Sequence, residues 1–437
     1  AADARTLPEK LDPEKGLAWR SPLPPGHSTP CVHGDSIFLT VFENKILSVV
    51  RLDRATGKML WKRNAPTKTI EQVHPTGSPA SCTPACDGER VYSFFGSFGL
   101  LCHDLDGKLI WSKPMGPFQD EFGANSSPIL VGDKLILNQD HDVDNFLTAL
   151  DKRTGKTIWK TSREGFTRSY STPVAWTFEG RTQLIVAGSL QLTGYDAETG
   201  KKVWWVDGLS RILDTTPVVS GNTAYVASWT PGGDAGQRIA MEAFPQAAEK
   251  YDKNQDGGIA KDELPRGAVL TRFYRIDLNQ DGKLDAEEWK KHARVFELAQ
   301  NVALAVKLGG KGNVTATHVQ WTQRQGLPTV PSPTVYQGVV SMIKKGGILT
   351  TLDAKTGEII KQDRAAGLGS YYASVVAGDG KIYLADERGT VSVLKAGREW
   401  EVLSSHKFGE RITATPVLQN GRVYLRTEEA LYNFGTE

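Results

Sequence analysis

The sequence predicts an all-β fold, an eight-bladed β-propeller, with a small α-helical insertion in the fifth blade. Three observations predict it. Two short sequence motifs, called here the turn phrase and the proline phrase, recur at the spacing typical of propeller blades, and one interval between successive proline phrases is far longer than a blade. The 437 residues include 44 Gly and 11 Trp, a mixture typical of many short strands joined by tight turns. The 52 Lys plus Arg nearly balance 50 Asp plus Glu, which argues against a nucleic-acid partner.

The turn phrase is Asp-x-x-Thr-Gly followed closely by Trp. It occupies residues 53–61, 151–159 and 196–204, recurs at 353–360 with Ile360 near the Trp position, and is shortened at 104–111. A strand that ends in Asp, a Gly with positive φ and a following strand describe a hairpin. We expect the Trp of each outer strand to pack against the neighbouring blade.

The proline phrase is Ser or Thr followed by Pro before an apolar strand, and it marks the inner strand of each unit. The eight marks are Pro30, Pro84, Pro128, Pro173, Pro217, Pro333, Val375 and Pro416. From Pro84 onward they are 41–45 residues apart, except that 116 residues separate Pro217 from Pro333. The sequence therefore predicts blades one to five, in their first part, over residues 16–233. An insertion over 234–300 follows, and residues 301–434 complete blade five and form blades six to eight.

The two ends of the chain complement each other. The last blade, from Ile412 to Phe434, lacks its outer Trp strand, whereas Gly16 to Trp19 forms an outer strand without a blade. We expect the two to pair, because this closure covers open strand edges and holds the ring shut.

These repeats resemble those of the pyrroloquinoline-quinone (PQQ) repeat propellers over almost the whole chain outside the insertion. Residues 138–142 (Asn-Gln-Asp-His-Asp), Leu150-Asp151 and residues 369–374 add to the resemblance. The family includes quinoprotein alcohol dehydrogenases, BamB-like scaffold lipoproteins of the outer-membrane barrel-assembly machinery, and uncharacterised exported proteins. The overall sequence pattern is most similar to that of the last group. This resemblance implies the fold more strongly than it implies a function.

The N-terminal residues and the cysteines indicate the compartment. Residues 1–3, Ala-Ala-Asp, read as the product of signal-peptidase cleavage, which predicts a periplasmic or secreted protein without a lipid anchor. No apolar run reaches the length needed to cross a bilayer. The spacing of the four cysteines, Cys31, Cys82, Cys86 and Cys102, is neither that of a redox motif nor that of a zinc site. We therefore expect them to be small buried core residues, and the alternative is a disulfide between Cys86 and Cys102.

Two acidic loops in the insertion match the EF-hand pattern, in which oxygens at positions 1, 3 and 5, a Gly at 6, a carbonyl at 7 and a Glu at 12 surround Ca2+. We expect two calcium sites. The candidate ligands are Asp252, Asn254, Asp256, Gly258 and Glu263 in the first loop, and Asp277, Asn279, Asp281, Lys283, Asp285 and Glu288 in the second.

The alternative is that these loops are merely solvated turns, but acids and bases are nearly balanced across the segment, so the pattern does not follow from composition. The second loop carries four carboxylates and the first three, so we expect the second to bind more tightly. Only residues 264–276 separate the loops. This favours a compact, dockerin-like pair over a sensor that opens a groove.

A propeller gathers the loops before its inner strands around a central funnel, the default binding site of the fold. His27, Asn125 and Asp144 are predicted there. The principal candidates are Asp140, His141, Asp142, Arg168, Tyr170, Asp214, Trp229, Tyr371, Tyr372 and Arg411. Such polar and aromatic residues suit a carbohydrate or another polar ligand. The alternatives are ion pairs that join blades and, for residues 140–144, a further cation site or an acid/base pair.

The function predicted from the sequence is that of an exported, monomeric calcium-binding propeller that binds a protein partner or a polar ligand at its funnel. One alternative is a polysaccharide hydrolase or lyase that uses Asp142, His141, Arg168, Tyr170 and Tyr371. A second is a PQQ-dependent oxidoreductase. The sequence argues against PQQ, because it has neither an adjacent pair of cysteines nor a Cys-x-x-Cys-His motif.

Overall fold

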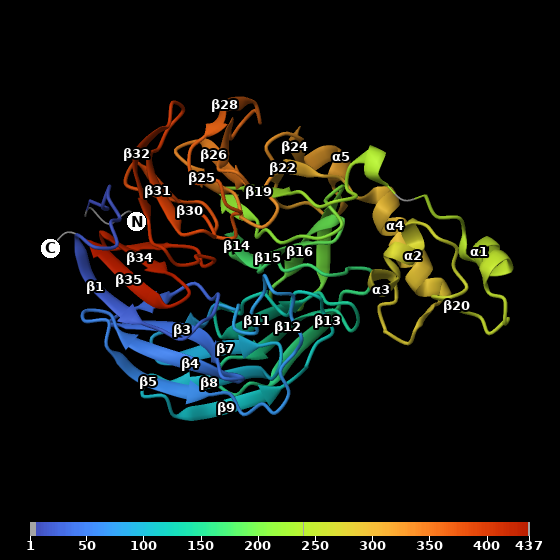
Figure 1. The fold of residues 1–437 in the computed structure, drawn as a ribbon, viewed down its shortest axis with the longest axis horizontal. Coiled ribbons are helices and arrows are strands. Elements are labelled where there is room, and N and C mark those ends of the chain that lie inside the picture. The colour runs from blue at the N-terminus through green and yellow to red at the C-terminus, as the bar shows by residue number, and fades with distance from the viewer. Residues whose placement is uncertain (1–5, 239, 436–437) are drawn as a thin grey trace.

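The computed structural model describes residues 6–238 and 240–435. Eight antiparallel sheets surround a central axis (Figure 1), which confirms the predicted eight-bladed propeller. Each inner strand begins directly after one of the eight marks of the proline phrase.

In each of the first four blades the strands follow one another from the axis outward. Blade one contains β2 (Cys31–His33), β3 (Ser36–Glu43), β4 (Ile46–Asp53) and β5 (Met59–Asn64). Blade two contains β6 (Ala85–Cys86), β7 (Arg90–Phe95), β8 (Gly99–Asp104) and β9 (Leu109–Pro114). Blade three contains β10 (Ile129–Val131), β11 (Lys134–Gln139), β12 (Phe146–Asp151) and β13 (Thr157–Ser162). Blade four contains β14 (Val174–Phe178), β15 (Arg181–Gly188), β16 (Gln191–Asp196), β17 (Lys202–Asp207) and the added parallel strand β23 (Gly312–Asn313).

The other four blades follow the same order. Blade five contains β18 (Val218–Ser220), β19 (Thr223–Ser228), β22 (Val302–Lys307) and β24 (Val319–Gln323), with α5 (Thr315–His318) before its last strand. Blade six contains β25 (Thr334–Tyr336), β26 (Val339–Lys344), β27 (Ile348–Asp353) and β28 (Ile359–Arg364). Blade seven contains β29 (Val376–Gly378), β30 (Lys381–Ala385), β31 (Thr390–Lys395) and β32 (Glu401–Lys407). Blade eight contains β33 (Val417–Gln419), β34 (Arg422–Arg426), β35 (Ala430–Gly435) and β1 (Leu17–Pro22).

The turn phrase joins neighbouring blades as predicted. In blade four the Asp196 carboxylate accepts hydrogen bonds from the backbone N–H and hydroxyl of Thr199, at 2.8 and 2.7 Å. Gly200 follows with φ of +69°, and a Cβ there would lie 2.4 Å from the ring of Trp159 in blade three. The Trp159 indole also donates to the Ala197 carbonyl at 3.2 Å. Glycine is therefore needed for the backbone conformation and for the close approach of Trp.

The predicted ring closure is confirmed. β1 pairs antiparallel with β35, so the N-terminal segment supplies the outer strand of the last blade (Figure 1). The Trp19 indole then donates to the Arg54 carbonyl of blade one at 3.1 Å. The first and last blades are thereby joined by the same kind of contact as blades three and four.

The long interval lies between β19 and β22 and forms a helical segment at the edge of the ring (Figure 1). Its elements are η1 (Ala235–Gln237), α1 (Phe244–Tyr251), β20 (Ile259–Ala260), α2 (Ala268–Thr271), α3 (Phe273–Ile276), β21 (Lys283–Leu284) and α4 (Ala286–Leu298). A small core that includes Ile259, Leu284 and Trp289 holds these elements together.

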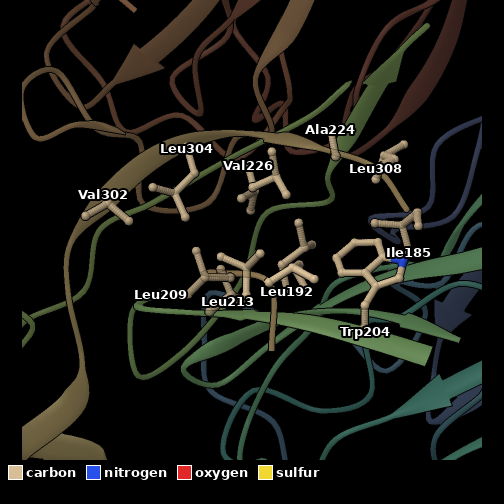
Figure 2. Close-up of a cluster of buried hydrophobic side chains, with 14 of the residues drawn as sticks. Ile185, Leu192, Trp204, Leu209, Leu213, Ala224, Val226, Val302, Leu304 and Leu308 are labelled. Atoms are coloured by element: carbon tan, nitrogen blue, oxygen red, sulfur yellow. The ribbon is translucent and has the colours of Figure 1, made fainter. Parts of the chain in front are cut away.

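Blades four and five share an apolar core despite the interruption. Figure 2 shows Leu192 and Trp204 of blade four facing Val226, Val302 and Leu304 of blade five. The Trp204 indole is fully buried. The two halves of blade five therefore pack as one sheet against blade four.

All four cysteines are free thiols, so the alternative Cys86–Cys102 disulfide is not formed. Cys82 and Cys102 are buried, as expected of small core residues, whereas Cys31 and Cys86 are half-buried. Within residues 6–238 and 240–435, no helix is long and apolar enough to span a membrane.

Candidate functional site

The central funnel contains a cavity of about 520 Å³. Its wall includes many hydroxyl side chains together with charged and aromatic groups. The charged, amide and aromatic residues of the wall include His27, Glu121, Asn125, Tyr170, Arg211, Asp214, Arg275 and Tyr372. A cavity of this size with hydroxyl and charged side chains in its wall suits a small, hydroxyl-rich or charged ligand.

A ring of hydroxyl groups surrounds the axis. The Ser or Thr of the proline phrase uses its backbone N–H to donate to the hydroxyl of the corresponding residue in the next blade. Seven such hydrogen bonds of 2.9–3.2 Å join Thr29, Thr83, Ser127, Thr172, Thr216, Ser332, Ser374 and Thr415 in that order. All eight residues line the cavity. The phrase that marks the blades thus also builds the inner wall of the funnel.

The predicted funnel residues divide into two groups. His27, Asn125, Tyr170, Asp214 and Tyr372 line the cavity. A smaller neighbouring cavity of about 260 Å³ contains Arg411, and His27 lies between the two.

Three further candidates, Asp144, Trp229 and Tyr371, lie away from this cavity. Asp144 is exposed, and Trp229 packs against the core between blades five and six. Tyr371 is buried and donates its hydroxyl to the Gly367 carbonyl at 2.9 Å. These three residues do not line the funnel cavity.

Asp140 is a structural partner in a fully buried ion pair. Both of its carboxylate oxygens accept from Arg163, at 2.7 Å each, and neither side chain is exposed. The guanidinium also donates to the Tyr195 hydroxyl at 2.5 Å and lies 3.9 Å from the centre of the Phe166 ring. Burial alone would lower the pKa of Arg163, but Asp140 and Tyr195 together more than offset this and raise it. This pairing corresponds to the structural alternative in the sequence analysis.

A second ion-pair network connects the propeller to the helical segment. Arg168 donates to both carboxylate oxygens of Asp142 and, at 2.9 Å, to Glu121. Glu121 also accepts from Arg275 of α3 at 3.1 Å. Gln119, two residues before Glu121, donates to the Leu278 carbonyl of the second acidic loop. The second loop is therefore attached to the funnel rim.

His141 lies beneath this network. It is buried, stacks on Phe118 with ring centres 4.2 Å apart, and places Nδ1 3.6 Å from Asp120. Asp120 in turn accepts from the Tyr170 hydroxyl at 2.7 Å. Tyr170 thus reaches the funnel wall with its hydroxyl already engaged.

The electrostatics of the funnel depart from those of free side chains. Burial, together with Asp120, raises the pKa of Asp214 to about 7. Burial and Arg411 lower the pKa of His27 to about 4, so that imidazole is neutral at pH 7. Burial and three neighbouring arginines, Arg275 foremost, lower the pKa of Arg211 to about 10. Arg211 still carries its positive charge at pH 7.

The first acidic loop, residues 252–263, is held by hydrogen bonds to its own backbone. Asp252 accepts from the N–H groups of Asp256 and Gly257, at 3.2 and 3.0 Å. Glu263 accepts from Lys253 and Ala260, at 2.9 and 2.8 Å. Gly257, at position 6, has φ of +89°.

The second acidic loop, residues 277–288, repeats this arrangement. Asp277 accepts from Asp281 and Gly282, at 3.1 and 3.0 Å. Glu288 accepts from Leu278 at 2.7 Å and forms a capping box with Asp285 at the start of α4.

The two loops pair at position 8, where Ile259 lies opposite Leu284. Lys283 donates to Asp256 across the pair at 2.5 Å. In the described part of the chain, no three His, Cys, Asp or Glu side chains are grouped so as to hold a metal by themselves. A cation in either loop would also require Asn and backbone carbonyl oxygens.

Several functional candidates were missed by the sequence analysis. Arg211 and Arg275 line the cavity but belong to no motif, and Glu121 is visible only through its two arginine partners. The hydroxyl ring did have a sequence signal, because its members are the Ser and Thr of the proline phrase.

Comparisons with known proteins support the architecture. A family model described as outer membrane protein assembly factor BamB matches residues 9–162, 143–244 and 265–436. The first acidic loop lies in the unmatched stretch between residues 244 and 265.

Curated relatives are distant. BamB of Yersinia pestis is 23% identical over 301 residues, which cover 60% of this chain and 74% of that protein. The quinohemoprotein alcohol dehydrogenase ADH IIB of Pseudomonas putida is 26% identical over 152 residues. That match covers 33% of this chain and 22% of the enzyme, about a fifth of its length.

Solved structures share the fold. BamB from Moraxella catarrhalis has a TM-score of 0.58 at 13% identity, with 94% of each chain covered. A europium-containing methanol dehydrogenase has a TM-score of 0.53 at 10% identity, with 98% of this chain and 95% of that chain covered. At these identities the likeness shows the fold alone. Because the family model matches most of the chain, the protein belongs to the BamB family of PQQ-like repeat propellers.

Proposed function

We propose that this chain is a calcium-binding propeller of the bacterial envelope that acts as a ligand-binding or protein-scaffolding module, with its ligand site in the central funnel. The carrying observation is the cavity of about 520 Å³ whose wall includes a ring of hydroxyls from all eight blades. PQQ-repeat relatives include both binding proteins and enzymes, so the family does not decide between binding and catalysis. The positions of the candidate side chains bear on this choice.

The arrangement of the predicted catalytic residues favours binding over hydrolysis. Asp142 is engaged by Arg168 through both oxygens, and Tyr170 donates to Asp120. His141 is buried and does not line the cavity. A general acid or base must reach the substrate proton, and these groups face one another instead.

The acidic loops support the calcium part of the proposal. Their candidate ligands are hard oxygen donors, the Gly at position 6 has the required positive φ, and the two loops pair at position 8. Glu263 and Glu288, the position 12 residues, are both buried beside their loops. A calcium ion would supply charge neutralisation and rigidity to the helical segment.

Similarity to BamB supports an envelope location and protein partners. The relatives from Yersinia pestis and Salmonella typhimurium are both named outer membrane protein assembly factors. By analogy, we place this chain in the periplasm or at the outer membrane, as a monomeric scaffold. PQQ is not part of the proposal.

A thermal-shift experiment tests the proposal. A ligand that binds only the folded state raises the unfolding midpoint, and the stabilisation grows with the logarithm of ligand concentration once that concentration exceeds Kd. The full chain is measured with EDTA or Ca2+, then in Ca2+ with neutral and acidic oligosaccharides and with PQQ, and product formation from each sugar is followed. We expect stabilisation by Ca2+ and by a sugar, without turnover.

Each contrary result has a distinct meaning. Sugar cleavage would establish the hydrolase alternative, and stabilisation by PQQ would favour the oxidoreductase. Absence of any calcium effect would refute the calcium sites. Glu288→Gln should reduce the calcium response, whereas the adjacent exposed Glu287→Gln is the matched control.

A further inference from the structure

The funnel cavity carries two guanidinium groups that the propeller leaves incompletely paired. Arg211 donates its Nε to the Pro231 carbonyl at 2.8 Å. In the described part of the chain, no carboxylate lies within salt-bridge distance of its guanidinium. Its remaining N–H groups are therefore available to a ligand in the cavity.

Arg275 reaches the same cavity from the helical segment. One of its terminal nitrogens donates to Glu121 at 3.1 Å, but Glu121 is shared with Arg168. The Arg275 Nε is buried and has no hydrogen-bond partner within the described residues. Arg168 is also paired with Asp142, whereas Glu121 is the one carboxylate that Arg275 contacts among the described residues, and the Arg275 Nε remains unused.

Further positive charge surrounds this pair. Arg272 lies beside Phe296, and the guanidinium carbon of Arg211 lies 5.7 Å from the centre of the same ring. Burial, and then the neighbouring arginines Arg275 and Arg272, lower the pKa of Arg211. Asp214, the other acid in the cavity wall, has its pKa raised to about 7 by burial and Asp120, so it offsets only part of this charge near neutral pH.

The hydroxyl ring adds donors of a second kind. Seven of its hydroxyls already accept an N–H from the preceding blade, and none of them donates to a protein group in residues 6–238 and 240–435. Their O–H groups are free to donate toward the axis. A ligand rich in acceptor oxygens matches this wall.

We propose that the funnel binds an acidic oligosaccharide, a short chain of hexuronate units, with a carboxylate held between Arg211 and Arg275 and the sugar hydroxyls against the hydroxyl ring. This inference rests on the funnel being the ligand site proposed above. Guanidinium groups bind carboxylates with paired, charge-assisted hydrogen bonds. Tyr372 and Phe122 line the same wall, and aromatic side chains there can pack against sugar rings.

Isothermal titration of the full chain in Ca2+ tests the proposal, with trigalacturonic acid as the probe. Its fully methyl-esterified form has the same rings without the charges. We expect the acid to bind, the ester to bind at least about tenfold more weakly, and the affinity for the acid to fall as NaCl rises.

Substitutions locate the site. Arg211→Gln and Arg275→Gln should each weaken binding of the acid by about tenfold or more. Arg181→Gln, an exposed arginine on β15, is the matched control and should leave affinity unchanged. Arg211→Lys keeps the charge but loses the paired geometry, so it should retain part of the affinity. Circular dichroism of each variant verifies that it is folded.

Three outcomes would overturn the inference. Equal binding of acid and ester would show that charge is not recognised, while leaving the funnel as a ligand site. Unchanged affinity in both arginine variants would place the ligand elsewhere. Tighter binding of a Glu-rich tripeptide would favour a peptide ligand. The thermal-shift experiment with EDTA and Ca2+ tests the calcium sites separately. A negative result for the calcium sites can therefore be distinguished from a negative result for the acidic sugar.

Discussion

Removing one partner of the Asp140–Arg163 pair should destabilise the protein strongly. Asp140→Asn keeps the side-chain shape but leaves the Arg163 guanidinium, which is fully buried, without a counter-ion. Breaking a buried ion pair in this way costs about 3–5 kcal/mol. Because Asp140 contributes two hydrogen bonds of 2.7 Å, we expect a loss of about 4 kcal/mol.

Urea unfolding at pH 7, followed by tryptophan fluorescence, measures this change as a fall in midpoint at constant slope. Asp133→Asn is the control, because the Arg153–Asp133 pair is exposed and 3.8 Å apart, and such pairs contribute about 0–1 kcal/mol. Replacing both buried partners, Asp140→Leu with Arg163→Met, should recover much of the loss. If Asp140→Asn costs no more than Asp133→Asn, the structural role assigned to Asp140 is refuted.

Two further perturbations follow from the turns and from the funnel. Gly200→Ala should lower the free energy of unfolding by about 3 kcal/mol, because of left-handed backbone strain and collision with Trp159. Gly221→Ala, where a Cβ would meet nothing within 4 Å, should lower it by about 1 kcal/mol. Equal losses measured by urea unfolding would contradict this prediction. Asp214 retains its proton in the folded state up to about pH 7 while the unfolded chain releases it near pH 4. Stability should therefore fall by about 3 kcal/mol between pH 5 and 8, and the wild type and Asp214→Asn would show parallel pH profiles if this were wrong.

The propeller could be predicted from sequence because its signals are local and repeated. The contact between Gly200 and Trp159 recurs in blade after blade, so its period is visible in one sequence. The seventh blade is informative, because it has Val375 at the proline position but still has Ser374 before it. The Ser374 hydroxyl accepts a hydrogen bond from the Ser332 N–H at 3.0 Å, as other hydroxyls of the ring do from the preceding blade. The hydroxyl, rather than the proline, is the constant feature of this phrase.

The candidate site was less predictable, because its contacts join distant parts of the chain. Asp140 meets Arg163 across 23 residues, and the sequence alone could not show whether this acid faces the funnel or an arginine. Arg275 enters the funnel because the helical segment folds back onto Glu121, 154 residues earlier. No local pattern encodes the direction in which an inserted segment packs.

Calcium titration of the EDTA-treated full chain by calorimetry tests the central claim most directly. We predict two bound ions per chain, with the tighter site lost in Glu288→Gln and the weaker one lost in Glu263→Gln. The controls Glu287→Gln and Asp262→Asn change exposed neighbours and should retain both sites. A titration without binding heat at any temperature, or two sites that survive both position 12 substitutions, would contradict the account.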